Sequence, residues 1–199
     1  WAKATLAVSN RLIDIQPRSL IIVERIVWPQ RGLKKYAACP GHLLPRLSGN
    51  LVLGVHHYSW SGPGRFIPGW AIPKRLHCCL RSVGLITKKN YGDMEAHRLK
   101  QKLGQEWGFL LDADACPVWV SEFGAHLEIP WEMKWLEVFA HFLADMDADW
   151  AYWPLNVGMK PGSNEDEPYG LLTSDWGMPL PMHDRRLQLL QTLGLSLVP

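Results

Sequence analysis

Four short apolar runs, spaced between longer helical or loop segments, constrain the fold of this chain more than any other feature. They span residues 19–23, 51–55, 116–121 and 150–153. The first two consist mainly of Leu, Ile and Val, which is typical of strands buried on both faces of a parallel sheet. Because helix-like patterns or loops separate the runs, so that strands alternate with helices along most of the sequence, the chain is predicted to form an α/β fold with a parallel sheet.

Apolar spacing predicts the helices that accompany these strands. They are expected over 1–14, over 93–107, from Pro130 onward, and over about 184–193. The first is predicted to carry Ala4, Val8 and Leu12 on one apolar face. The third begins with proline, which is typical of a first helical turn, and is expected to place Trp131 and Trp135 in the core.

Each apolar run ends near a residue that can bind or react: Glu24, His56 with Tyr58, Glu122, and Trp153. Parallel strands present such residues together at their carboxyl ends, where both β/α barrels and doubly wound sheets bind their ligands. None of the apolar runs is followed by a glycine-rich phosphate-binding loop, which argues against a nucleotide ligand. The expected site therefore lies at the carboxyl edge of the sheet.

Glu122 is the most informative of these residues because it ends the apolar run Val118-Trp119-Val120. A carboxylate in that place is costly to bury, so it must be exposed, paired or functional. A structural ion pair with an arginine is one explanation, and a catalytic carboxylate is the other. Taken singly, His56, Tyr58 and Trp153 also fit ordinary core residues.

Composition narrows the function classes. A net charge of +2 offers no electrostatic case for nucleic acid, and no apolar run is long enough to span a membrane. The vicinal pair Cys78-Cys79 lacks the spacing of a zinc site, so neither a metal nor a cofactor is expected. The chain has 11 tryptophans, which suit stacking on the flat apolar faces of sugars.

The ordered motifs resemble glycoside hydrolase family 5, the cellulase-like (β/α)8 barrels. Val118–Gly124 resembles the nucleophile strand of that family. Residues 20–24 resemble the fifth strand of the family, residues 50–58 the sixth, and residues 150–156 the eighth. Residues 169–176 resemble the segment before the closing helix of the family. The resemblance implies an α/β fold that is a partial TIM barrel of roughly strands five to eight. It also implies that residues 1–199 form one partial catalytic domain without its N-terminal half.

The same resemblance implies roles for the strand-end residues. Glu122 would be the nucleophile of a retaining cleavage of β-glucan or a related β-glycoside. His56 and Tyr58 would hydrogen-bond around the nucleophile and the sugar, and Trp153 would stack on the sugar ring. Glu24 would have a supporting role. An extracellular location is the corresponding expectation.

Two departures from the family pattern set limits on this expectation. The family's acid/base is a Glu preceded by Asn at the end of the fourth strand, and the Asn-Glu pair of this chain, Asn164-Glu165, lies after the eighth. Arg25 replaces the glycine that the family has after its fifth strand. The acid/base is thus expected to be absent from these residues and the isolated chain to have little or no activity.

Two other functions remain open at this point. A degenerate, non-catalytic relic that binds carbohydrate through exposed tryptophans would explain the missing acid/base and Arg25. A self-standing doubly wound binding protein fits the strand and helix alternation but matches the motif order less well.

Overall fold

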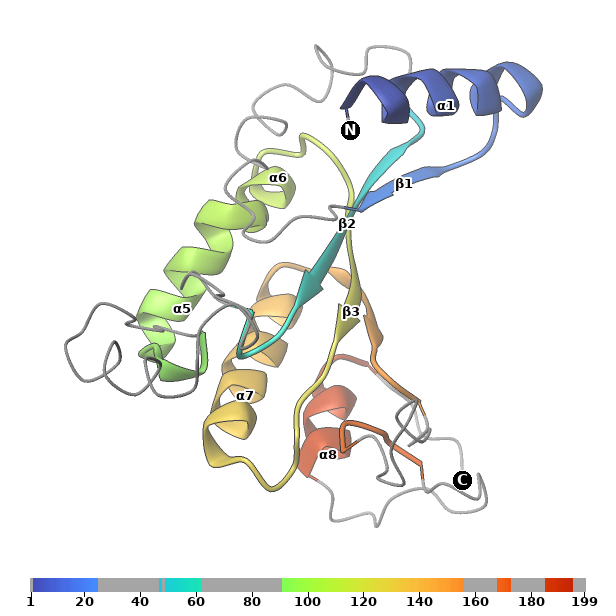
Figure 1. Cartoon of the computed structure of the whole chain (residues 1–199). Coiled ribbons are helices and arrows are strands. Elements are labelled where there is room, and N and C mark those ends of the chain that lie inside the picture. The colour runs from blue at the N-terminus through green and yellow to red at the C-terminus, as the bar shows by residue number, and fades with distance from the viewer. Residues whose placement is uncertain are drawn as a thin grey trace, which may run out of the picture.

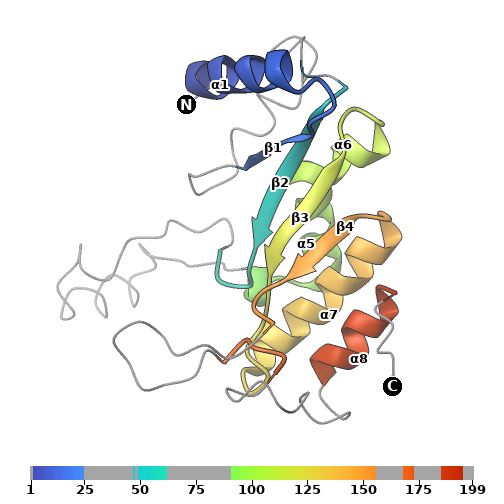
Figure 2. The same ribbon diagram turned by 90° about the vertical axis from the view of Figure 1, so that its right-hand side faces the viewer.

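The computed structural model describes residues 2–24, 47, 49–61, 91–155, 168–172 and 185–194. Its centre is a four-stranded sheet of β1 (Ile21–Glu24), β2 (Leu51–His57), β3 (Val118–Phe123) and β4 (Asp149–Tyr152). The strands lie in the order β1-β2-β3-β4 and all pairs are parallel (Figure 2). The predicted parallel α/β fold is confirmed, and each strand coincides with one of the four apolar runs.

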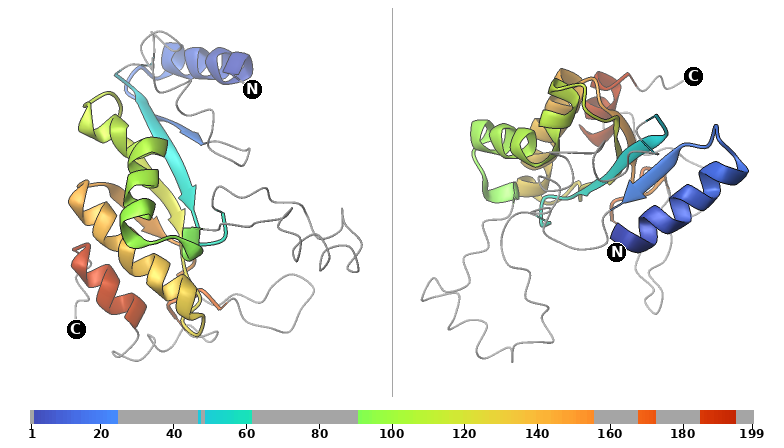
Figure 3. Two further views of the ribbon diagram at one scale, coloured as in Figure 1. Left: turned by 90° about the vertical axis from the view of Figure 1, so that its left-hand side faces the viewer. Right: turned by 90° about the horizontal axis from the view of Figure 1, so that it is seen from above.

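The helices cover one face of this sheet. They are α1 (Ala2–Ile15), α5 (Ala96–Leu103), α6 (Phe109–Asp112), α7 (Pro130–Asp145) and α8 (Arg185–Thr192), with a 3-10 turn at Tyr91–Asp93 and a π-helical segment at Gly104–Gly108. Helices α5 to α8 pack on the same side of the strands, whereas α1 lies beside β1 at the amino ends of the strands (Figures 1 and 3). The carboxyl ends of the strands are therefore left clear of these helices.

The core lies between the sheet and the helices. Val120 and Phe123 of β3 are completely buried, and the Phe123 ring meets the Phe139 ring of α7 edge to face at 5.4 Å between centroids. Leu103 and Trp107, whose spacing predicted an apolar helix face, are also completely buried. Each such side chain contributes about 1.5–3 kcal/mol of burial free energy, so this layer is what holds β3 in place.

The other face of the sheet is more open than the apolar runs predicted. Ile22 is 46% exposed, and Val52 and Trp119 are half-buried. The expectation of strands buried on both faces is therefore wrong for the described part of the chain. Helices α5 to α8 pack on one side of the sheet, so side chains along the strands alternate between a buried and an open face.

Two predicted helix faces also need correction. Val8 and Leu12 of α1 are exposed, and Ser9 is buried instead. Apolar residues lie on several sides of α1, so their spacing alone did not identify which side of the helix is buried. Trp131 is 39% exposed, whereas Trp135 is buried, because Trp131 sits in the first turn of α7 and covers Gly92 rather than the sheet.

Several predicted features fall outside the described residues. They are Arg25, the pair Cys78-Cys79, the pair Asn164-Glu165, and the tail beyond 172. Cys116 is buried as a free thiol. Within the described ranges, no helix is both long and apolar enough to cross a membrane.

Candidate active site

Glu122 reaches the open face of the sheet because β3 contains an irregularity. Trp119 pairs with Gly54 and Glu122 pairs with His56, so three steps along β3 match two along β2. The pairing of β3 with β4 has a shift of the same kind, between Val120 and Phe123. An extra residue of this type, a β-bulge, re-aims side chains and is common beside active sites.

The bulge changes which side chains share a face. Val118 and Val120 are buried against the helices, and so is Phe123. Ser121 and Glu122 are consecutive, yet both are half-buried and both contact groups on the open face. A regular strand would have sent one of the two into the core.

Both oxygens of the Glu122 carboxylate have neighbours from the end of β2. The Tyr58 hydroxyl donates a hydrogen bond of 2.5 Å to Oε1 of Glu122. Nδ1 of His56 lies 3.5 Å from Oε2. The structure thus brings together the three residues that the sequence predicted around the nucleophile position.

Tyr58 is held so that it remains a donor. Its backbone N–H donates to Oγ of Ser61 at 3.0 Å, and that hydroxyl donates back to the Tyr58 carbonyl at 2.7 Å, which fixes the turn after β2. Burial raises the pKa of the Tyr58 hydroxyl well above its usual range, and the hydrogen bond to Glu122 adds to the effect. The phenol therefore keeps its proton and offers it to the carboxylate.

Glu24 joins the same cluster from β1. Its Oε2 lies 3.2 Å from Nε2 of His56, and its Oε1 accepts a 2.6 Å hydrogen bond from Oγ of Ser121. His56 thus has a carboxylate at each ring nitrogen. Sequence patterns indicated Glu24, but they did not indicate Ser121, whose part in the cluster depends on the bulge.

Trp153 lies at the edge of this cluster and is 52% exposed. Its backbone N–H donates to the Phe123 carbonyl at 2.8 Å, and its carbonyl oxygen lies where a Cβ on Gly124 would stand. Gly124 is therefore needed for the close approach of the chain after β4 to the end of β3. Trp153 is therefore exposed next to the chain segment that directly follows Glu122.

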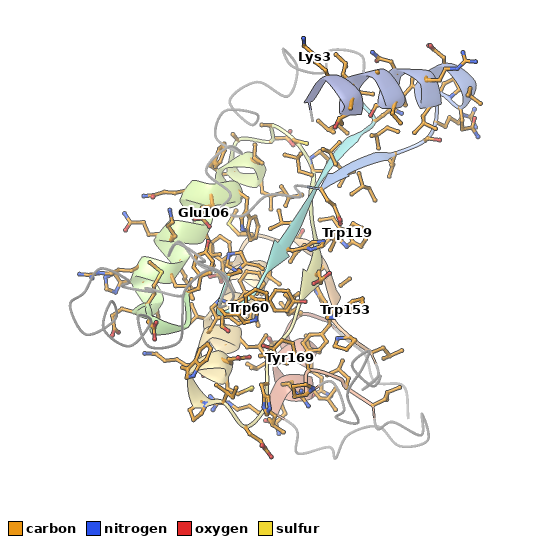
Figure 4. All side chains as sticks on the ribbon, in the orientation of Figure 1. Lys3, Trp60, Glu106, Trp119, Trp153 and Tyr169 are labelled. Carbon is orange, nitrogen blue, oxygen red and sulfur yellow. The ribbon has the colours of Figure 1, made fainter. Side chains whose placement is uncertain are left out.

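A second aromatic group, which the sequence did not single out, lies against Tyr58. The Trp60 ring stacks on the Tyr58 ring at 4.9 Å between centroids, and its indole N–H donates to the Tyr169 hydroxyl at 3.2 Å. Trp60, Trp153 and Tyr169 all lie near the carboxyl ends of β2 and β3 (Figure 4). Trp60 is 42% exposed, so one more aromatic surface is open to a ligand.

No family model matches the chain. An endoglucanase from Paenibacillus polymyxa is 24% identical over 181 residues, which cover 88% of this chain and 40% of that protein. The catalytic domain of the major endoglucanase from Xanthomonas campestris superposes with a TM-score of 0.63 at 19% identity, covering 97% of this chain and 49% of that one.

The fold is that of half a cellulase barrel. An endocellulase from Pyrococcus horikoshii, in a complex with cellotetraose, matches this half-barrel with a TM-score of 0.61 at 17% identity. The match includes 97% of the residues of this chain and 48% of those of the endocellulase. The chain thus spans less than half the length of these relatives, and the predicted resemblance to cellulase-like proteins is confirmed.

Proposed function

We propose that this half-barrel carries the nucleophile side of a retaining β-glucan hydrolase, with Glu122 as the nucleophile. The observation that carries the proposal is the hydrogen bond from the Tyr58 hydroxyl to Oε1 of Glu122 at the carboxyl edge of the sheet. The three endoglucanase and endocellulase relatives support β-glucan as the substrate class.

Retaining hydrolysis proceeds in two steps. A Glu122 oxygen forms a bond to the anomeric carbon while the glycosidic C–O bond breaks, and the electron pair leaves with the departing sugar oxygen. A second carboxyl group, about 5–5.5 Å from the first, protonates that oxygen and later activates water. Glu24 approaches the other ring nitrogen of His56, so its place suits support rather than proton donation.

The substrate would lie across the open face at the carboxyl ends of β2, β3 and β4. Trp153 would stack on the sugar beside the cleaved bond, and Trp60 with Tyr169 would bind a neighbouring sugar. Stacking of this kind uses the flat apolar face of a pyranose ring. The extracellular location that the family resemblance implied is part of this proposal.

A mechanism-based reagent tests the nucleophile without needing the acid/base. In 2,4-dinitrophenyl 2-deoxy-2-fluoro-β-cellobioside, dinitrophenolate leaves without protonation and the fluorine slows hydrolysis of the glycosyl-enzyme. We expect the 199-residue chain to gain the mass of one 2-deoxy-2-fluorocellobiosyl group, on the peptide that contains Glu122. The Glu122→Gln variant should gain none.

The matched control is Glu95→Gln, because Glu95 is an exposed carboxylate at the start of α5. It should be labelled like the unaltered chain. Labelling of another residue, or equal labelling of Glu122→Gln, would refute the assignment. On unactivated cellotetraose we expect little or no turnover by this chain, since proton donation to the leaving sugar would then be required.

A non-catalytic carbohydrate-binding protein is the second candidate, and the exposure of Trp153 and Trp60 favours it. It predicts that cellotetraose binds in a calorimetric titration while the fluorinated reagent labels nothing. Labelling at Glu122 would exclude it.

A further inference from the structure

We propose that Glu24 is a positioning residue that holds Glu122 in place through His56. Its catalytic consequence rests on the nucleophile assignment proposed above, but the contacts themselves do not. Three neighbouring strands contribute: Glu24 from β1, His56 from β2, and Ser121 with Glu122 from β3.

The Glu24 carboxylate is fixed at both oxygens. Ser121 donates to Oε1 at 2.6 Å, and Oε2 faces Nε2 of His56 at 3.2 Å. Gly54, the partner of Glu24 in the strand pairing, supplies the space, because a Cβ on Gly54 would collide with Cγ of Glu24. The glycine of β2 and the glutamate of β1 thus form a matched pair across the two strands.

The fixed carboxylate then determines how the His56 ring stands. An ionised carboxylate only accepts hydrogen bonds, so a ring nitrogen of His56 that carries a proton makes a favourable contact with the carboxylate beside it. The His56 ring thus faces Oε2 of Glu24 at 3.2 Å on one side and Oε2 of Glu122 at 3.5 Å on the other. With Tyr58 bound to Oε1 of Glu122 and the His56 ring beside Oε2, rotation of the carboxylate is restricted.

The first test measures the rate at which the fluorinated cellobioside labels Glu122. Glu24→Ala should lower the maximal labelling rate at least about ten-fold, because a small misplacement of a reacting group has a large effect on rate. The concentration that gives half-maximal labelling should change little, since Glu24 is placed behind His56 and not at the sugar platforms. Gly54→Ala should reproduce the loss, because its methyl group displaces Glu24 without altering it.

A double variant shows whether the two changes act through one contact. Glu24→Ala with Gly54→Ala should label no more slowly than either single variant, whereas independent effects would multiply. Glu95→Ala serves as the control for removal of an exposed carboxylate and should label at the unaltered rate. Unaltered labelling of Glu24→Ala, or a multiplied loss in the double variant, would overturn the proposal.

The second test does not require any reaction. An imidazole N–H that is hydrogen-bonded to a carboxylate exchanges with water more slowly than an unbonded one, so its proton resonance is sought at low temperature and assigned to His56 by its loss in His56→Gln. That resonance should persist in Glu95→Ala and disappear in Glu24→Ala and Gly54→Ala. If it persists in Glu24→Ala, Glu24 does not position His56, whatever the labelling result. If the resonance behaves as expected but Glu122 is never labelled, the nucleophile assignment fails and the positioning contact stands.

Discussion

Acidification should destabilise this fold through one buried histidine, His57. Its side chain is completely buried on the helix-facing side of β2, where its ring packs against the rings of Tyr91, Trp135 and Phe139. Among the described residues neither ring nitrogen has a hydrogen-bond partner. Burial lowers the pKa of His57 from 6.5 to about 3.

One carboxylate opposes this effect. Oε2 of Glu106 lies 4.0 Å from Nε2 of His57. At this distance the carboxylate would attract a charged imidazole, but the separation is too long for a hydrogen bond. The same oxygen already accepts a 2.6 Å hydrogen bond from the Tyr91 hydroxyl. Burial therefore outweighs the distant carboxylate, and His57 is neutral in the folded chain at neutral pH.

The size of the effect follows from linkage. The unfolded chain protonates His57 below pH 6.5 and the folded chain does so only near pH 3, so the unfolding free energy falls as the pH falls through that window. Between pH 7 and pH 5 the loss is about 2 kcal/mol, and its slope approaches about 1.4 kcal/mol per pH unit.

Urea unfolding followed by tryptophan fluorescence at pH 7 and pH 5 measures this loss. His57→Phe keeps an aromatic ring among aromatic neighbours and removes the titration, so it should lose about 2 kcal/mol less than the unaltered chain over the same interval. His141→Gln, at an exposed position of α7, should behave like the unaltered chain. Equal losses in His57→Phe and the unaltered chain would refute the neutral state of His57.

Two further predictions concern the sugar platforms. Trp60→Ala should weaken cellotetraose binding by about 1 kcal/mol, or roughly five-fold, in a calorimetric titration, because one stacking surface is lost; unchanged affinity would remove Trp60 from the site. Gly124→Ala should also weaken binding, because its methyl group takes the place of the Trp153 carbonyl oxygen and displaces the stacking ring. An unshifted Trp153 in a crystal structure of Gly124→Ala would contradict this reasoning.

Sequence patterns predicted most of the architecture, because each strand coincides with a contiguous apolar run and the longer helices coincide with regular apolar spacing. They did not predict the π-helical segment Gly104–Gly108 or α6. They were less reliable for which face of an element is buried. Val8 of α1 and Ile22 of β1 are apolar but exposed, because whether a residue is buried depends on which other element packs against it. Local hydrophobicity carries no information about that neighbour.

The candidate site divides along the same line. The sequence by itself determined that Glu122 comes at the end of an apolar run and that His56, Tyr58 and Trp153 lie at the ends of neighbouring strands. Parallel strands bring their carboxyl ends to one edge of the sheet. Only the tertiary structure decided that Ser121 and Glu122 share the open face, since a bulge is a property of the pairing between strands. It alone also joined Glu24 to His56, because that contact needs β1 beside β2 with a glycine at residue 54 between them.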